Sequence, residues 1–120
     1  YEIQTKISKC IGLEGTSHVP FNDGMVADCA EYGDTCYVHT DRVWIKGTIT
    51  LHCNIMLTNC TGGHPIIEGT ELRLNKGDML VYAVSELEHG SSMVYGSVPR
   101  HLWIFGYCVS ELDCMRITEG

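Results

Sequence analysis

The stretch V-W-I-K-G-T-I-T-L-H-C-N-I-M-L, from Val43 to Leu57, decides the fold class of this chain. Every second residue from Val43 onward is apolar or small, whereas the alternate residues, from Trp44 to Met56, are mostly polar. A repeat of two over this length predicts a long β-strand with one buried face. Because that face needs a cover, the rest of the chain must supply a second layer.

Shorter apolar runs separated by turn residues continue this pattern along the chain. They predict strands over residues 1–9, 35–40, 79–84, 93–98 and 101–109. The run at 79–84 is apolar on both faces, which favours a central strand. Asn75–Asp78 is predicted to form the hairpin turn before it.

One short helix is predicted over Met25–Glu31, where Asn22 or Asp23 can cap its start and Gly33 can end it. The whole pattern predicts a single all-β domain over residues 1–120, mostly antiparallel, built as a small disulfide-stapled β-sandwich or barrel with at most one short helix. A sheet covered by one helix is the alternative architecture.

The charge balance argues against several classes of partner. The 120 residues include 8 Lys and Arg against 15 Asp and Glu, which gives a net charge of −7. Nucleic acids and anionic membrane surfaces both require clustered basic residues, so neither is an expected partner. The chain also lacks a run of 18 apolar residues, so no insertion into a membrane is expected.

The seven cysteines are the main indication of where the protein is located. None form a C-x-x-C pair, which argues against a zinc knuckle or a redox motif. Three closely spaced pairs predict disulfides, which indicate a secreted or extracellular mature chain. The pairs are Cys29 with Cys36, Cys53 with Cys60, and Cys108 with Cys114. Cys10 is then left free or bridges two chains in a homodimer, and a Cys10–Cys114 bridge is a competing arrangement.

The six histidines are the natural candidates for a metal site. None belongs to an H-x-H or H-E-x-x-H motif, and we identify no acidic partner at ligand spacing. We therefore predict no metal site, no cofactor and no catalytic residue. A site assembled across the sheet from His39 and His52, which lie on predicted strands, is the alternative.

Two segments resemble known families. Leu74–Gly90 resembles the second half of a cupin barrel, where a Gly-Asp turn leads a strand that delivers a histidine. The first-half H-x-H motif is absent, with His52-Cys53-Asn54 in its place, so we interpret Gly77-Asp78 as a plain turn. The closely spaced Cys108 and Cys114 resemble the C-terminal cysteine pair of toxin B-subunits, although no long central helix accompanies them here.

Exposed side chains supply the remaining candidates for binding. Trp44, Met56 and Tyr95 are candidate partner-binding residues, because an exposed aromatic or apolar anchor favours association. Asn59 begins an N-C-T sequence that matches the glycosylation pattern of glycoproteins.

These observations together favour a secreted, cysteine-rich interaction protein without catalytic activity. We expect it to bind a host or other partner protein, as a pathogen effector or a surface-glycoprotein module does. A carbohydrate-binding module or toxin-like lectin is the first alternative. The second is a small extracellular hydrolase similar to ribonucleases, with Glu71, Arg73 and His101 as its acid–base and anion-binding set.

Overall fold

The computed structural model describes residues 6–7, 9–13, 18–21, 27–43 and 45–113, with only the backbone considered at 18–21 and 27–30. Strands dominate these residues, and helical residues occur at 6–7, 9–10 and 111–113. The strands are β1 His18–Phe21, β2 Ala27–Ala30, β3 Cys36–His39, β4 Thr48–Met56, β5 Thr61–Gly62, β6 Pro65–Ile67, β7 Thr70–Glu71, β8 Met79–Ala83, β9 His89–Ser91, β10 Val94–Tyr95 and β11 Arg100–Ser110. The prediction of a mostly antiparallel all-β fold is confirmed.

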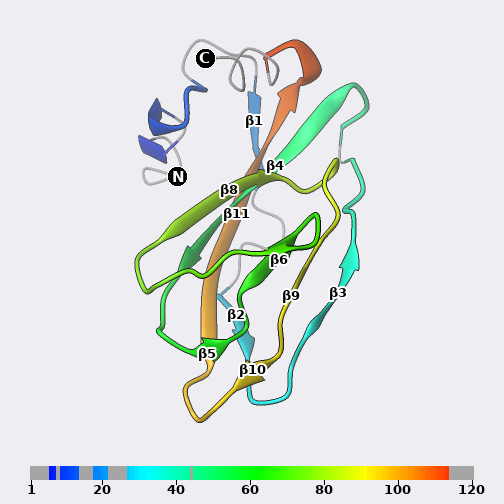
Figure 1. Ribbon diagram of the computed structural model, residues 1–120. Coiled ribbons are helices and arrows are strands. Elements are labelled where there is room, and N and C mark those ends of the chain that lie inside the picture. The colour runs from blue at the N-terminus through cyan, green and yellow to red at the C-terminus, as the bar shows by residue number, and fades with distance from the viewer. Residues whose placement is uncertain (1–5, 8, 14–17, 22–26, 44, 114–120) are drawn as a thin grey trace.

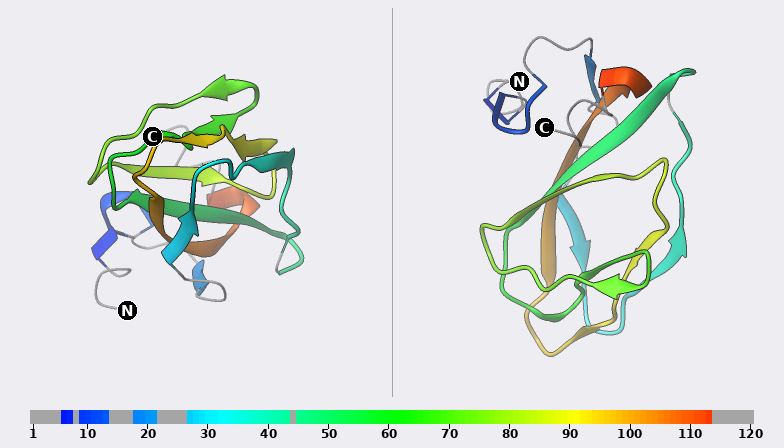
Figure 2. Two further views of the ribbon diagram at one scale, coloured as in Figure 1. Left: turned by 90° about the horizontal axis from the view of Figure 1, so that it is seen from below. Right: turned by 45° about the horizontal axis from the view of Figure 1, so that its top comes forward.

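Two sheets form the layers of the molecule (Figures 1 and 2). The first, sheet A, has the order β1-β11-β4-β8, and β2 also pairs with β11. The second, sheet B, has the order β3-β9-β6-β7, and β5 and β10 pair separately. The long strands β4 and β11 run antiparallel from the Met56–Leu102 pair to the Thr48–Ser110 pair, and they form the backbone of sheet A.

The apolar face of β4 is buried, as the alternation predicts, but sheet B is not what covers it. Leu51 and Cys53 pack with Phe105, Tyr107 and Val109 of β11 against Leu13 of the N-terminal segment. Ile7 and Ile11 extend this contact from the same segment. The N-terminal segment therefore covers sheet A. Its residues 6–7 and 9–10 are helical, whereas the sequence predicted a strand over 1–9.

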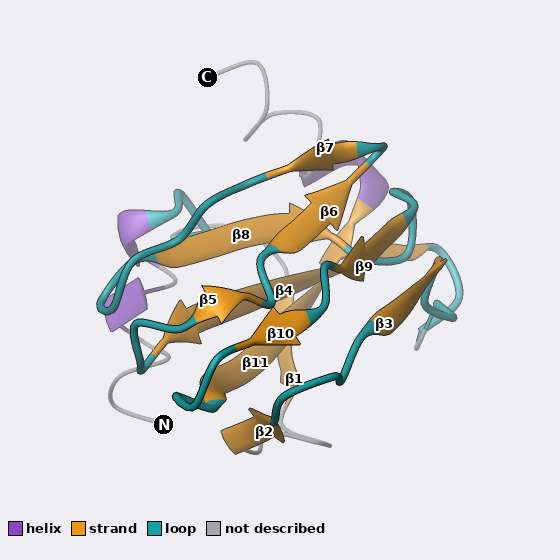
Figure 3. Cartoon of the chain, turned by 60° about the horizontal axis from the view of Figure 1, so that its bottom comes forward, coloured by secondary structure: helices purple, strands orange, loops and turns teal. Residues whose placement is uncertain are grey.

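The other face of β4 carries polar side chains, yet it is also buried. Thr50 and Met56 are 0% exposed and Asn54 is 7% exposed. Sheet B lies over this face, as the view from below in the left panel of Figure 2 and the tilted view of Figure 3 show. The polar side chains of the central strand therefore face the space between the two sheets, which is where the candidate site lies.

Two local predictions were wrong for tertiary reasons. Ala27–Ala30 forms β2 and pairs with β11 from Arg100 to Trp103, so sheet hydrogen bonds override the helix-capping signals, and the cap positions 22 and 23 lie outside the described residues. Strand β8 lies at the edge of sheet A, not at its centre. It is apolar because Val81 and Ala83 face the buried cluster and Tyr82 faces the cavity.

The predicted disulfides were also wrong wherever the structure tests them. Cys10, Cys36, Cys53, Cys60 and Cys108 carry no disulfide bond. The extended backbone separates close pairs, since Cys53 lies three residues inside the end of β4 and Cys60 lies in the loop beyond it. The Cys29 side chain and Cys114 lie outside the described residues. None of the described helical segments is long and apolar enough to cross a membrane.

Candidate metal centre

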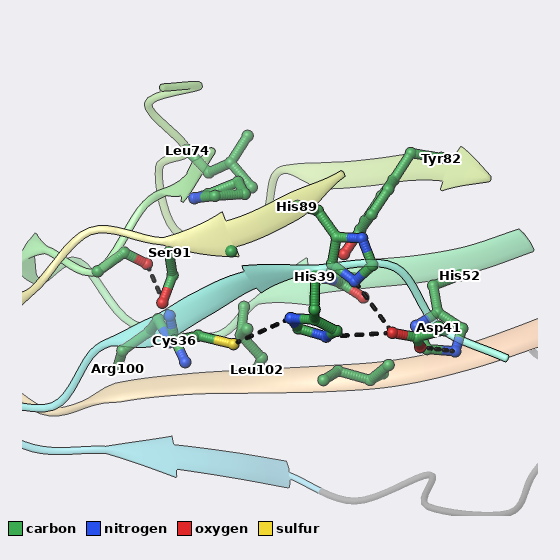
Figure 4. Close-up of a pocket in the computed structure, with 15 residues that line it drawn as sticks. Cys36, His39, Asp41, His52, Leu74, Tyr82, His89, Ser91, Arg100 and Leu102 are labelled. Atoms are coloured by element: carbon green, nitrogen blue, oxygen red, sulfur yellow. Dashed lines mark hydrogen bonds and ion pairs between the residues drawn. The ribbon is translucent and has the colours of Figure 1, made fainter. Parts of the chain in front are cut away.

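A cavity of about 200 Å³ lies between the two sheets (Figure 4). Strands β4, β8 and β11 form one wall, and β3, β6 and β9 contribute to the other. Since a water molecule takes about 30 Å³ in the liquid, the cavity has room for a small organic molecule. Its lining combines apolar side chains, among them Leu102 and Ile104, with histidines, Asp41 and Arg100.

Two of the histidines are neighbours across strands of sheet B. His39 of β3 is the register partner of His89 of β9, and their ring centroids are 4.4 Å apart. The strands approach closely because residue 90 is glycine. A Cβ at Gly90 would lie 2.7 Å from the carbonyl oxygen of Cys36. The missing side chain therefore permits the strand pairing that brings the two imidazoles together.

Asp41 places a carboxylate between these imidazoles. Its backbone N–H donates to the carbonyl oxygen of Val84 at 2.9 Å, which ties the segment after β3 to the end of β8 in the opposite sheet. Asp41 Oδ1 lies 3.1 Å from His39 Nε2 and 3.2 Å from His89 Nε2. Oδ2 lies 4.0 Å from His52 Nε2, so three imidazoles surround the carboxylate (Figure 4).

The remaining ring nitrogens fix the orientation of His39 and His89. His39 Nδ1 lies 2.6 Å from the carbonyl oxygen of Tyr37, and His89 Nδ1 lies 2.8 Å from that of Leu87. A carbonyl oxygen only accepts, so each Nδ1 carries the proton and donates. The two Nε2 atoms both lie next to Asp41 Oδ1, and a ring held through its Nδ1–H is the arrangement that metal-binding histidines adopt.

This donor set fits a divalent metal ion. One ligand atom from each of His39, Asp41 and His89 lies within 4.8 Å of those of the other two. In a tetrahedral zinc site with bonds of about 2.0–2.2 Å, neighbouring ligand atoms lie about 3.3 Å apart. The nitrogen–oxygen distances of 3.1 and 3.2 Å are close to that separation. Two imidazoles and one carboxylate also leave coordination positions open for a ligand.

His52 and Tyr82 stand beside the cluster as register partners on β4 and β8. Burial lowers the pKa of His52 below its ordinary 6.5, against the opposite effect of the Asp41 carboxylate. Burial raises the pKa of Tyr82 to about 12, although a side-chain hydrogen bond from Asn54 acts in the opposite direction. At neutral pH the imidazole is thus a proton acceptor and the phenol is a donor.

The structure separates the other residues singled out from the sequence. Glu71 lies on β7 of sheet B, where it accepts from the Ser92 hydroxyl at 3.2 Å. His101 lies on β11 of sheet A and alternates with Arg100 and Leu102, which line the cavity, so its side chain faces the other side of the sheet. The ribonuclease-like set of Glu71, Arg73 and His101 is therefore not assembled.

The candidate binding residues have different surroundings. Met56 is 0% exposed, so its side chain is not available to a partner, whereas Tyr95 is 48% exposed. Trp44 lies outside the described residues. Asn59 is exposed, and its Oδ1 accepts from the Lys76 backbone N–H at 2.7 Å. Partner binding at Tyr95 and glycosylation at Asn59 remain predictions.

The sequence carries two signals for this cluster. His39 and Asp41 form an H-x-D pair, and two residues spaced in this way share one face of extended chain. The expectation that no acidic residue stands at ligand spacing to a histidine was therefore wrong. His89 lies between the strands predicted over 79–84 and 93–98, and the structure places it on a further strand, β9. It is nonetheless the histidine at the end of the segment that resembles half of a cupin barrel.

Comparisons with known proteins give similarity to solved structures alone. No family model matches the chain, and no curated protein matches its sequence. A cupin protein from Bacteroides fragilis aligns with a TM-score of 0.48 and 16% identity, over 81% of this chain and 79% of that one. KdgF from Halomonas sp. aligns with a TM-score of 0.47 and 16% identity, over 84% of each chain. At these values the likeness supports no inference about function.

The prediction of a disulfide-stapled, cysteine-rich interaction protein was wrong, whereas the expected extracellular location remains a prediction. It rested on cysteine pairs, and none of the five cysteines with described side chains forms a disulfide. It also assumed that no chemical site rises above background, whereas His39, Asp41 and His89 converge at a cavity. The lectin and ribonuclease alternatives shared the same premise of an extracellular stapled scaffold.

Proposed function

We propose that this protein binds a divalent transition-metal ion through His39, Asp41 and His89 and uses it to act on a small molecule in the cavity between the sheets. The observation that carries this proposal is the convergence of two Nε2 atoms on Asp41 Oδ1, each with its Nδ1–H held by a backbone carbonyl. Such an ion, when bound, acts as a Lewis acid that polarises a carbonyl or activates water.

The residues around the proposed metal ion have two roles, which are to hold the ion and to exchange protons or hydrogen bonds with the bound molecule. His89 is buried and Asp41 is anchored to Val84, so these two side chains hold a rigid half of the centre. His39 is more exposed and lies at the open side. His52, whose pKa is lowered, accepts a proton, and the Tyr82 hydroxyl donates a hydrogen bond to a ligand oxygen.

Direct metal titration tests the proposal. We expect the metal-free protein to bind one Zn²⁺ or Co²⁺ by calorimetry, and the visible spectrum of bound Co²⁺ to report its coordination. His89→Gln should weaken binding at least a hundredfold, about 2.7 kcal/mol, because it removes a buried ligand. His101→Gln is the matched control, since His101 faces away from the cavity.

Two results would contradict the proposal. If wild-type protein binds neither ion, then His39, Asp41 and His89 form an ion-pair network within the protein and not a metal site. Equal metal affinity in His89→Gln and wild type would place the binding elsewhere, for example at the cysteines.

A further inference from the structure

A second charged group lines the same cavity on its other side. Arg100 is the first residue of β11 and is 7% exposed. Its Nη1 donates to the carbonyl oxygen of Gly63 at 2.9 Å. The guanidinium carries a permanent positive charge and several N–H donors in the wall of the cavity.

The surroundings of Arg100 hold it in place. A Cβ at Gly63 would lie 3.3 Å from Arg100 Cδ, so the glycine provides the space that the arginine side chain occupies. Thr58 Oγ1 donates to the carbonyl oxygen of Pro99 at 2.8 Å and accepts from the backbone N–H of His101 at 3.1 Å. The backbone on both sides of Arg100 is thus fixed by one side chain, and the guanidinium is positioned before any ligand arrives.

Asn54 supplies an independent sign of a ligand. It is 7% exposed and lines the cavity from β4. Its side chain makes a hydrogen bond with the Tyr82 hydroxyl. Its Oδ1, in contrast, is buried and has no hydrogen-bond partner among the described residues. A buried acceptor without a partner destabilises the folded protein, and a hydroxyl donor from a bound molecule would satisfy it.

We infer that the cavity binds a small hydroxycarboxylic acid, whose carboxylate pairs with Arg100 and whose hydroxyl donates to Asn54 Oδ1. The inference rests on the proposed function, because the same molecule would extend toward the metal centre at His39, Asp41 and His89. The planar guanidinium matches a carboxylate with two parallel hydrogen bonds. A chain of net charge −7 repels anions in general. The buried positive charge of Arg100 would attract an anionic ligand into the cavity in spite of this repulsion.

The test uses metal-free protein, which separates this subsite from the metal centre. Malate and succinate differ by one hydroxyl, and succinamide removes the charge. We expect malate to bind more tightly than succinate by calorimetry, and succinamide not to bind. Arg100→Met should weaken malate tenfold or more, because charge-assisted hydrogen bonds are lost. The matched control is Arg73→Met, which removes the same charge from an exposed position.

A second variant keeps the test decisive if Arg100→Met does not fold. Asn54→Leu should abolish the preference for malate over succinate and leave the affinity for succinate unchanged. The inference is overturned if wild-type protein binds neither acid, if Arg100→Met and Arg73→Met bind malate equally, or if inorganic phosphate binds through Arg100 and the carboxylates do not.

Zinc titration of the same proteins keeps the two proposals apart. Wild-type protein that binds zinc but no carboxylate would retain the proposed metal function and overturn the subsite. Wild-type protein that binds malate through Arg100 but no zinc would retain the subsite and remove the metal function. Unchanged zinc affinity in Arg100→Met, together with loss of malate, would support both.

Discussion

The individual cysteines differ in their surroundings, and this difference is measurable. Cys10 and Cys36 are exposed, whereas Cys53 is 0% exposed and its burial raises the pKa to about 12. The thiolate is the reactive form, so a buried thiol of high pKa is inert at neutral pH.

We predict that iodoacetamide modifies Cys10 and Cys36 in the folded protein and leaves Cys53 unmodified until the chain is unfolded. Peptide mass spectrometry at pH 8 measures each site separately, and modification in denaturant is the control. A disulfide that joins any of these three cysteines in freshly prepared protein, or alkylation of Cys53 at the rate of Cys36, would contradict the structure.

The histidine at position 52 makes stability depend on pH. The pKa of His52 is lower in the folded state than its ordinary 6.5, because burial disfavours the charged ring. Below pH 6.5 the unfolded chain therefore binds the proton more readily, and the folded state loses stability as the pH falls toward the lowered pKa. Above pH 6.5 the ring is neutral in both states and contributes no pH dependence.

We predict that His52→Gln lessens the fall in stability between pH 6.5 and pH 5 relative to wild-type protein. Urea denaturation in the presence of a chelator measures the free energy of unfolding without metal. His101→Gln serves as the comparison, because it changes a histidine on the other face of sheet A. An identical pH slope in His52→Gln and wild type would show that burial of His52 does not control this dependence.

At the scale of the elements, the proposed metal centre depends on the close approach of β9 to β3. A Cβ at position 90 would come within 2.7 Å of the Cys36 carbonyl oxygen and 3.1 Å of the Tyr37 carbonyl oxygen. These are backbone atoms, so the strands must separate to admit a methyl group.

We predict that Gly90→Ala lowers the free energy of unfolding by about 1–3 kcal/mol, as overpacking does, and weakens zinc binding by moving His89 away from His39. Denaturation and metal titration measure the two effects. Thr70→Ala, at the exposed opposite edge of sheet B, should change stability by about 0.5 kcal/mol or less. Unchanged zinc affinity in Gly90→Ala would show that the proposed metal centre does not depend on the close pairing of β3 with β9.

The N-terminal segment is a second element on which the fold depends, because it covers the outer face of sheet A. Leu13 is 0% exposed and packs against Leu51, Cys53 and Phe105. We predict that Leu13→Ala lowers the free energy of unfolding by about 2–4 kcal/mol. Leu112→Ala, at a position 71% exposed, is the matched control and should cost little. Equal effects in the two variants would show that the segment does not cover the sheet.

At the scale of the whole molecule, a bound metal ion would link the two sheets. His39 and His89 belong to sheet B, while Asp41 is hydrogen-bonded to Val84 beside the end of β8 in sheet A. The site exists only in the folded chain, so binding must stabilise the fold.

We predict that zinc at a hundredfold excess over its dissociation constant raises the free energy of unfolding by about 2.7 kcal/mol and that a chelator reverses the effect. Thermal unfolding monitored by circular dichroism measures the shift in Tm. His89→Gln should show no shift at the same concentration. An equal shift in that variant would assign the stabilisation to nonspecific binding.

The sequence by itself determined the all-β class, because the alternation within Val43–Leu57 shows which side chains share a face of a strand. The observed strand β4 covers Thr48–Met56 of that stretch. The strands at Cys36–His39, Met79–Ala83 and Arg100–Ser110 and the turn before β8 were predictable for the same local reason. The spacing of the cysteines led to a wrong prediction of disulfides. Spacing measures distance along the chain, and in an extended strand residues that are close in sequence lie far apart in space.

Only the tertiary structure decided that the polar face of β4 lies inside the molecule. The alternation of apolar and polar residues shows that the two faces of a strand differ, but it does not show which part of the chain covers each face. Here the N-terminal segment covers the apolar face and sheet B covers the polar one. The cavity therefore gathers His39, His89 and Arg100 from strands far apart in the sequence, and such a meeting is set by strand pairing that no local pattern specifies.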